Sequence, residues 1–324
     1  MFGTVPAGLP PVAVPPGTAH GSFMSHTTRN AVVMAVGPGA IANTLDTIDS
    51  LLFYASADTK LFLVDDCTAD GTYPALQAIG DPRIVLLRND RPHGYAGLLA
   101  TLATGFRACL ARGPFATVLK FDTDALMTGP GVFDDVWDFL HLNQHVGICG
   151  RHLLNYDGGS KSFRTHTAAM LQRCGFPPRD DRAEGGFGWI CAAAMRRGWG
   201  LGENIFGGAY FLRYACLAKM AAHGYLDPVT RPANWIAEDV YYTMCAVATG
   251  YDRAHFAAPL APLALAHGCL PTSVAALHAD GMKVLHSVDK GRWTTAEEND
   301  GMTPRAYFRR VRQEAAASAC AALG

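Results

Sequence analysis

The sequence predicts an α/β fold in which a mostly parallel, Rossmann-like central sheet is flanked by helices. Four short apolar runs, each typical of a buried strand, lie at residues 31–36, 60–66, 83–88 and 117–121. Helical or turn-to-helix patterns separate them, and this alternation indicates a parallel sheet covered on both faces. Polar or charged residues follow three of the four runs. Open α/β sheets bind their ligands at the carboxyl ends of strands, so these residues are the first candidates for a site.

The first predicted strand, 31–36, ends at Gly37-Pro-Gly39. Residues 41–54 then show the apolar spacing of a helix. Two glycines after a strand are only a weak sign of a dinucleotide site, because the third spaced glycine is missing. Val36 ends the strand at the ligand edge of the sheet, and we expect it to contact a nucleotide there.

The second and third predicted strands also end in residues suited to ligands. Residues 67–72 have the polar and glycine content of a turn into a helix, and a longer helical pattern covers 95–110. Four side chains at these strand ends are therefore candidates for nucleotide binding: Asp65, Asp66, Arg88 and Asn89.

The fourth predicted strand, 117–121, delivers Asp122 and Asp124 at its carboxyl end. At positions i and i+2 of a continuing strand, two side chains point the same way, and a turn there lets both face one ion. Two carboxylates in a cleft repel each other unless a cation or protons intervene, and Mg²⁺ suits such a pair combined with substrate phosphates. The alternative is a turn followed by a helix cap.

From about residue 130 the regular alternation weakens into a second half with mixed α+β character. We predict a helix at 132–142, a strand at 146–150, a helix through Ala222 after Gly207–Arg213, a helix at 240–249, a strand at 283–288 and a helix at 304–322. No element is assigned to 155–208. Residues 1–28 are rich in Pro, Gly and Ala, which is typical of a flexible arm.

Composition excludes some classes of protein. Of the 324 residues, 49% are hydrophobic and 17% charged, as in ordinary globular proteins, and the net charge of −1 does not favour a nucleic-acid partner. The nine cysteines form no Cys-x-x-Cys pair and mostly lie in apolar runs, which indicates a reducing compartment. No apolar run reaches the roughly 18–20 residues of a membrane span. We therefore expect a cytoplasmic protein and leave peripheral membrane contact open.

Several short motifs follow one another in a characteristic order. Residues 64–72 contain an acidic pair followed by Asp-Gly-Thr, and Asp122-Thr-Asp124 follows the fourth strand. Between them, Asn89 precedes a helical segment with small residues at Gly94, Ala100 and Gly105.

Further motifs follow in the second half: Gly207-Gly208, Glu238-Asp239 before a predicted helix, and His286 within Val-Leu-His-Ser. In this order the motifs resemble those of the GT-A nucleotide-sugar glycosyltransferases, in particular the inverting enzymes often called family 2. The Lys-Phe-Asp-Thr-Asp and Glu-Asp-Val-Tyr segments also resemble fringe-like galactosyltransferases. The resemblance covers roughly residues 31–290.

This resemblance implies a GT-A fold with a nucleotide-sugar half and an acceptor half. It suggests a division into a flexible arm, 1–28, a nucleotide-sugar-binding half, 29–140, an acceptor-binding and catalytic α+β half, 141–292, and a C-terminal helical tail, 293–324. Gly207 and Gly208 fall where the family has a glycine-containing acceptor loop.

The resemblance also implies a Mn²⁺ or Mg²⁺ ion bound by Asp122, Asp124 and His286, with Asp122 also able to touch the ribose. An imidazole beside carboxylates suits Mn²⁺ better than Ca²⁺. Lys290 and Arg292 would help to hold the diphosphate. The alternatives are a structural histidine in an apolar strand and a solvated basic loop.

The acceptor hydroxyl loses a proton during transfer, and a carboxylate within hydrogen-bond reach serves as general base. The resemblance implies Asp239 for this role, with Glu238 as the alternate. Acidic residues in the first turn of a helix are otherwise explained as caps. Trp189, Trp199 and Trp235 offer apolar faces on which a sugar ring can pack, although buried core tryptophans are an equally good interpretation.

We therefore expect an inverting, metal-dependent transferase of the hexosyltransferase type. A UDP-sugar is the expected donor, with GDP and dTDP open as alternatives, and the acceptor is the hydroxyl of a carbohydrate, a lipid-linked or another molecule. By analogy, the setting is polysaccharide biosynthesis. Three other functions remain: a sugar nucleotidyltransferase, a glycoside hydrolase using Asp124 and Asp239, and a non-catalytic sugar-nucleotide-binding protein.

Overall fold

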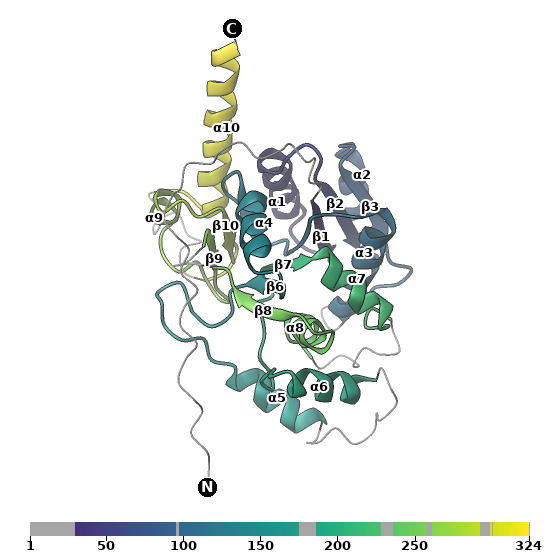
Figure 1. The fold of residues 1–324 in the computed structure, drawn as a ribbon. Helices are drawn as coiled ribbons and strands as arrows, with labels where there is room; N and C mark the ends of the chain where they lie inside the picture. Colours follow the sequence, from purple (N-terminus) through teal and green to yellow (C-terminus); the bar gives the residue numbers. More distant parts are fainter. Residues whose placement is uncertain are drawn as a thin grey trace.

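A computed structural model (Figure 1) describes residues 30–94, 97–174, 186–227, 236–257, 261–291, 299 and 301–323. In these residues the strands form a seven-stranded sheet, in the order β3-β2-β1-β4-β7-β6-β8, and a three-stranded sheet, in the order β5-β10-β9. The strands of the large sheet are β1 (Ala31–Val36), β2 (Lys60–Asp65), β3 (Ile84–Arg88), β4 (Thr117–Phe121), β6 (Val146–Gly150), β7 (Ala209–Arg213) and β8 (Asp252–His255). Those of the small sheet are β5 (Ala125–Met127), β9 (Leu263–Leu265) and β10 (Val284–His286).

The predicted α/β fold with a mostly parallel central sheet is confirmed. Parallel pairings join β3 to β2, β2 to β1, β1 to β4 and β6 to β8, and antiparallel pairings join β7 to β4 and to β6. The four strands predicted from the first 121 residues therefore lie side by side and parallel. Strand β7 extends this sheet into the second half of the chain.

The helices separate these strands in the order that the sequence predicts for the first half. They are α1 (Ile41–Tyr54), α2 (Thr72–Ala78), α3 (Leu98–Arg112), α4 (Val132–Leu142), α5 (Arg164–Cys174), α6 (Phe187–Arg196), α7 (Tyr214–Ala222), α8 (Glu238–Ala248), α9 (Val274–Ala279) and α10 (Pro304–Leu323). The bounds of α1 and α4 agree with the prediction. The predicted start of α3 at residues 95 and 96 lies outside the described residues.

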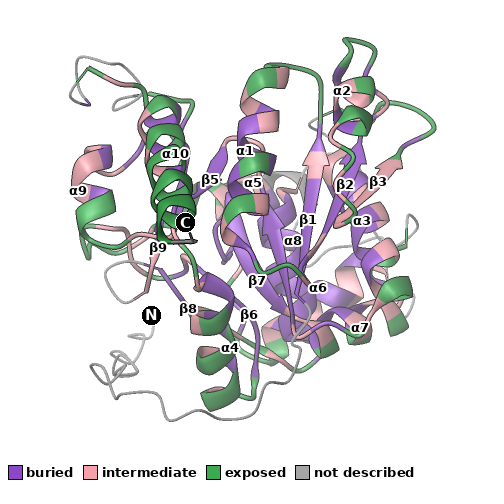
Figure 2. Ribbon diagram, turned by 90° about the horizontal axis from the view of Figure 1, so that it is seen from above, coloured by how far each residue is buried: buried purple, intermediate pink, exposed green. Residues whose placement is uncertain are grey.

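Two helix layers cover the large sheet because its strand residues alternate between two faces. Val33 and Tyr210 point into a core shared with α3, α6, α7 and α8. Met34 and Phe211 point into the opposite core, shared with α1, α2 and α4. Figure 2 shows the buried strands between helices whose outer surfaces are exposed.

The small sheet lies at the carboxyl end of β4 and brings two distant segments together. Strand β5 starts directly after Asp124 and pairs antiparallel with β10, so that Ala125 lies opposite His286. Strand β9 covers the other edge of β10. The prediction placed a strand at 283–288, and the structure confirms its centre while ending the ladder at His286.

Several elements were not predicted. Helices α5 and α6 occupy part of the unassigned region 155–208, and β5, β8 and β9 have only three or four residues each. Helix α8 begins earlier than expected, so that Glu238 and Asp239 form its first turn rather than the loop before it. Acidic residues are stabilised in a first helical turn by the helix dipole, which accounts for this earlier start.

Helix α10 packs against the body of the molecule with its first half only. Phe308 is buried among residues of the small sheet and α9. The side chains of residues 313–322 are exposed, and this end of the helix extends away from the remainder of the molecule (Figure 1).

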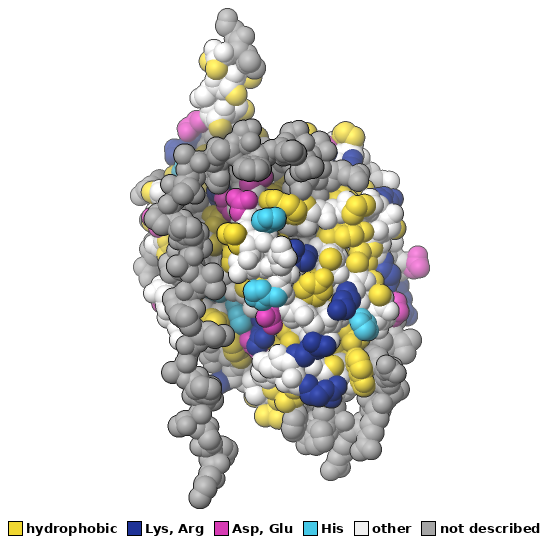
Figure 3. Space-filling view, viewed as in Figure 1, with side chains coloured by type: hydrophobic (Ala, Val, Ile, Leu, Met, Phe, Trp, Pro, Cys, Tyr) yellow, Lys and Arg dark blue, Asp and Glu magenta, His cyan; other side chains and the backbone are white. Residues whose placement is uncertain are grey.

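On the face that Figure 3 shows, Lys and Arg side chains gather in the lower half, over the region of α6, α7 and α8. The chain as a whole carries a formal charge of −1, so this basic character is local. Within the described residues, no helix is both long and apolar enough to cross a membrane.

Candidate active site

Asp122, Asp124 and His286 form a cluster at the carboxyl end of β4. One ligand atom from each of the three side chains can be chosen so that all lie within 4.8 Å of one another. His286 Nε2 is 3.1 Å from Asp124 Oδ1 and 3.9 Å from Asp122 Oδ2. Two carboxylates and one imidazole make a donor set that suits Mn²⁺ or Mg²⁺ with further oxygen ligands. The structure thus brings together the three residues that the sequence proposed as metal ligands.

The orientation of His286 favours metal binding. Its Nδ1 is 2.8 Å from the carbonyl oxygen of Ala266, so the proton on Nδ1 is donated there. The other nitrogen, Nε2, faces the two carboxylates and would offer its lone pair to a bound cation. Metal-binding histidines commonly have such a carbonyl or carboxylate partner on the second nitrogen.

The backbone of the loop that carries the two aspartates is held at each residue. The Asp122 amide donates to Gly208 O, and the Val288 amide donates to Asp124 O. The carbonyl of Thr123 accepts hydrogen bonds from Thr47 Oγ1 at 2.8 Å and from Arg305 Nη2 at 3.0 Å. This loop is therefore preorganised by contacts from α1, α10, β10 and the segment before β7.

Asp124 is surrounded by donors. Ser287 Oγ donates to Asp124 Oδ2 at 2.8 Å, and Lys290 Nζ lies 2.7 Å from the same oxygen. Burial alone would raise the pKa of Asp124, but the interactions with His286, Lys290 and Ser287 outweigh burial and lower it. Asp124 is thus ionised at neutral pH, as a metal ligand must be.

Lys120 connects the metal cluster to the acidic pair of α8. Its ammonium group is buried beneath the cluster and contacts Asp122, the carbonyl of Gly207 and Glu238, the last at 3.2 Å. Burial alone would lower the pKa of Lys120. The negative charges of Asp122 and Glu238 outweigh burial and raise the pKa, so the amine stays charged. Sequence analysis did not select Lys120, although its position two residues before Asp122 indicates the same face of the strand.

Asp239 lies beside this group and is deeply buried. Its Oδ2 accepts hydrogen bonds from Asn204 and from the Gly207 amide, and its Oδ1 accepts one from the Val240 amide at 2.7 Å. Burial and the neighbouring Glu238 raise the pKa of Asp239 to about 7, despite Lys161 nearby. A carboxylate with this pKa is suited to accept a proton near neutral pH.

Gly207 and Gly208 allow the two parts of the site to approach. A Cβ at Gly208 would lie 2.4 Å from the ring of His286, and one at Gly207 would lie 2.4 Å from Glu238 Oε1. Both positions therefore require glycine for packing. Their predicted contact with an acceptor stays a prediction.

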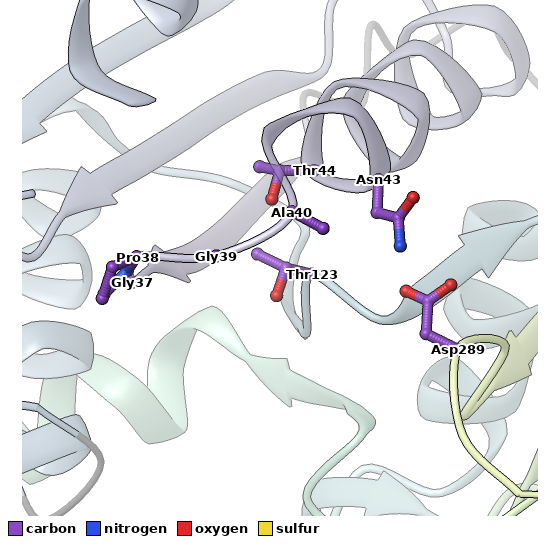
Figure 4. Close-up of a pocket in the computed structure, with 8 residues that line it drawn as sticks. All are labelled: Gly37, Pro38, Gly39, Ala40, Asn43, Thr44, Thr123 and Asp289. Atoms are coloured by element: carbon purple, nitrogen blue, oxygen red, sulfur yellow. The ribbon is translucent and has the colours of Figure 1, made fainter. Parts of the chain in front are cut away.

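An open pocket of about 250 Å³ lies next to the cluster (Figure 4). It is lined by the loop after β1, the first turn of α1, the middle residue of the Asp-x-Asp loop and one residue after β10: Gly37, Pro38, Gly39, Ala40, Asn43, Thr44, Thr123 and Asp289. Residues at the start of α1 line this pocket, and the positive end of the helix dipole there favours a negatively charged ligand.

The nucleotide-binding candidates on β2 and β3 form a separate group. Asp66 accepts hydrogen bonds from Asn89 Nδ2 at 2.8 Å and from the Gly94 amide at 2.8 Å. Asp65 lies 3.2 Å from Arg88 Nε. In this structure these side chains bind each other and order the loop after β3, and their contact with a nucleotide stays a prediction.

The remaining candidates are distributed differently. Val36 has a buried side chain, and its carbonyl accepts a hydrogen bond from the Asp66 amide. Trp189 on α6 packs against the core beneath the sheet. Trp235 and Arg292 lie outside the described residues.

Neither a protein-family model nor a curated protein sequence matches the chain. Solved structures with a similar fold include the mannosyltransferase PcManGT from Pyrobaculum calidifontis in complex with GDP-Man and Mn²⁺ (TM-score 0.44, 14% identity, 71% of this chain, 55% of that chain). They also include TarS 1–349 from S. aureus (TM-score 0.42, 13% identity, 71% and 58%) and S. aureus TarS (TM-score 0.40, 13% identity, 71% and 35%). The chain spans little more than half the length of the first two structures.

Proposed function

We propose that the chain is an inverting, metal-dependent glycosyltransferase of the GT-A type. It transfers a sugar from a nucleoside diphosphate donor, a UDP-sugar in our proposal, to an acceptor hydroxyl. The observation that carries the proposal is the joint geometry of the site. The cluster Asp122–Asp124–His286 lies at a strand end, and Lys120 links it to a first helical turn that carries a buried carboxylate with a raised pKa.

Asp122, Asp124 and His286 would hold the divalent cation. The cation, when bound, stabilises the negative charge that develops on the leaving diphosphate. The pocket beside Thr123 would receive the nucleotide, since residues of the Asp-x-Asp loop and of the start of α1 line it. Lys290, already at the edge of the cluster, adds a positive charge on the same side.

Asp239 acts as the general base in this proposal. The acceptor oxygen attacks the anomeric carbon, the bond from that carbon to the phosphate oxygen breaks, and its electron pair goes to the diphosphate. The acceptor proton moves to Asp239. Glu238 is the weaker candidate, because its carboxylate is paired with Lys120, whereas Asp239 is hydrogen-bonded only to an amide side chain and backbone amides.

Product analysis tests this proposal. The purified protein would be incubated with Mn²⁺ and a panel of UDP-, GDP- and dTDP-sugars, and release of the nucleoside diphosphate would be measured with and without sugar acceptors. We expect turnover of one donor class that disappears in Asp124→Asn and falls at least about 100-fold in Asp239→Asn, the usual range for a general base.

The competing functions predict different outcomes. A nucleotidyltransferase would consume a nucleoside triphosphate and release pyrophosphate, and a non-catalytic protein would bind the donor without turnover. If Asp124→Asn and Asp239→Asn each retained full activity, both assigned roles would be wrong. The anomeric configuration of the product, observed by NMR, separates inversion from retention.

A further inference from the structure

Two cationic side chains lie next to Asp239, outside the metal cluster. Arg151 directly follows β6, and its guanidinium carbon is 4.1 Å from the ring centre of Phe206. One Arg151 nitrogen, Nη1, donates to Leu265 O at 2.7 Å. Its Nε is buried and has no hydrogen-bond partner among the residues that the structure describes. Because buried donors are normally satisfied, this nitrogen indicates a missing acceptor.

Lys161 also lies near Phe206. Its Nζ donates to the carbonyl of Asn204 at 2.8 Å and lies 5.8 Å from the ring centre of Phe206. The side chain of Asn204 in turn contacts Asp239. Burial lowers the pKa of Lys161 to about 7, because the opposing effect of the Asp239 carboxylate is smaller than the effect of burial. Burial also lowers the pKa of Arg151, to about 10.

Among the described residues, Asp239 acts on both cations and Glu203 acts on Lys161 through longer-range attraction, but no carboxylate pairs with either cation directly. In the part of the chain that the structure describes, no carboxylate lies within 4.0 Å of Arg151 or Lys161, and Asp239 uses its oxygens on other donors. The neighbouring Glu203 does not supply the missing charge, because His152 and Arg253 bind it. Burial disfavours the charged forms of both side chains, and a bound anion would favour them, so the arrangement suits a ligand that brings negative charge.

We propose that Arg151 and Lys161 form an anion subsite that binds a phosphate or carboxylate group carried by the acceptor. This inference rests on the proposed function and deepens it, because it assigns an anionic acceptor to residues near Asp239 that do not line the nucleotide pocket. Phe206 lies between the two regions, with its ring against His286 at 5.3 Å and against Arg151. On the nucleotide side, Lys290 already serves the diphosphate.

Direct binding to the full chain tests the subsite. Protein freed of divalent metal with EDTA would be titrated calorimetrically with inorganic phosphate, glycerol 3-phosphate, glycerate and glycerol. Metal removal prevents the anions from binding through the cluster. The variants are Lys161→Gln and Arg151→Gln. The matched control is Arg310→Gln on α10, because its half-exposed side chain pairs with Glu314 and contacts neither Asp239 nor Phe206. Affinity for UDP with Mn²⁺ is measured in every variant.

We expect an anion to bind the unmodified protein and glycerol not to bind. Loss of either cation should weaken anion binding at least about tenfold, the effect of losing a charge-assisted hydrogen bond, while Arg310→Gln changes nothing. Comparison of glycerol 3-phosphate with glycerate tells whether the subsite prefers phosphate or carboxylate.

Three outcomes would overturn the inference: no anion binds, anion binding is unchanged in both variants, or UDP–Mn²⁺ affinity falls in parallel with anion affinity. In the last case the two cations serve the leaving diphosphate. A different failure, in which the unmodified protein binds no nucleotide with Mn²⁺, would contradict the proposed function itself.

Discussion

His286 is held in a single orientation by groups on three sides. Ala266 O accepts the proton on Nδ1, the ring of Phe206 lies 5.3 Å away edge-on, and Gly208 leaves the remaining side free of any side chain. Metal sites depend on such supporting contacts as well as on the ligands. The glycine at 208 therefore supports the candidate metal site, although it contributes no ligand atom.

Gly208→Ala is expected to displace the His286 ring, since the new Cβ would lie 2.4 Å from it. Affinity for Mn²⁺ should fall by about 10–100-fold, as it does when a supporting contact is lost. Electron paramagnetic resonance of free Mn²⁺ measures this affinity. Gly268→Ala is the control, because a Cβ there meets no atom within 4 Å. Equal affinities in the two variants would show that His286 does not bind the metal.

The pKa of Asp239 leads to a pH prediction. In its proposed role as general base, Asp239 must be ionised, and burial together with Glu238 raises its pKa to about 7. The logarithm of kcat/KM should therefore rise with pH and level off above about pH 7, with Lys161 sharing the titration. A profile that is flat from pH 5 to 8 in Mn²⁺ would argue against a buried base with this pKa.

At the scale of elements, Glu203 joins β8 to the loop before β7. Its carboxylate contacts His152 at 2.7 Å, Arg253 at 2.9 Å and the Gly200 amide at 2.7 Å. Burial would raise the pKa of Glu203, but these donors outweigh burial and lower it to about 2. The stabilisation is therefore present above the unfolded pKa of about 4.3 and is lost as pH falls towards about 2.

Glu203→Gln is expected to lower the free energy of unfolding at pH 7 by about 3 kcal/mol, because Arg253 loses its buried partner. The difference from the unmodified protein should shrink as pH falls from about 4.3 to about 2. Urea unfolding at several pH values measures it. The exposed Glu314→Gln variant serves as control, and a difference that is independent of pH would contradict the electrostatic explanation.

Elements with strong local patterns were predictable, whereas those defined by distant contacts were not. The helices α1 and α4 and the strands β1 and β6 follow from apolar periodicity within their own segments. The three-residue strands β5 and β9 are too short to show an apolar pattern. Each forms by pairing with β10, which lies between them.

The same distinction holds within the site. Asp122, Asp124, His286 and Asp239 were recognised from short motifs. The role of Arg305 could not be predicted from the sequence, because its contact with the Thr123 carbonyl spans 182 residues. The sequence also gives no sign of Arg151 and Lys161, because a single basic residue in a loop is usually solvated and only the structure shows that these two are partly buried.

At the scale of the whole molecule, α10 anchors the C-terminal part of the described chain to the metal loop. Asp46 on α1 is buried and pairs with Arg305 at 3.1 Å and with Arg312 at 2.6 Å. Arg305 also binds Asp289, which lines the pocket beside the cluster. The first half of α10 is thus required for the arrangement of the site, and its exposed second half is not.

Two truncations separate these halves. Deleting residues 313–324 should leave the thermal midpoint within about 1 °C, a change of less than about 1 kcal/mol. Deleting 304–324 should destabilise the fold by more than about 3 kcal/mol, since Asp46 then remains buried without its partners and the burial of Phe308 is lost. Calorimetry compares the two. Equal midpoints would show that the Arg–Asp contacts of α10 contribute little to stability.

The central claim is that Asp124 and its neighbours bind a nucleoside diphosphate through a divalent cation. Thermal unfolding with UDP, GDP and dTDP, each with and without Mn²⁺, tests it most directly in the unmodified protein and in Asp124→Ala. We expect one nucleotide at about 100 times its Kd to stabilise the unmodified protein by about 2.7 kcal/mol only when Mn²⁺ is present, and to have no effect on Asp124→Ala. Stabilisation that is independent of Mn²⁺ and unchanged in the variant would contradict the claim.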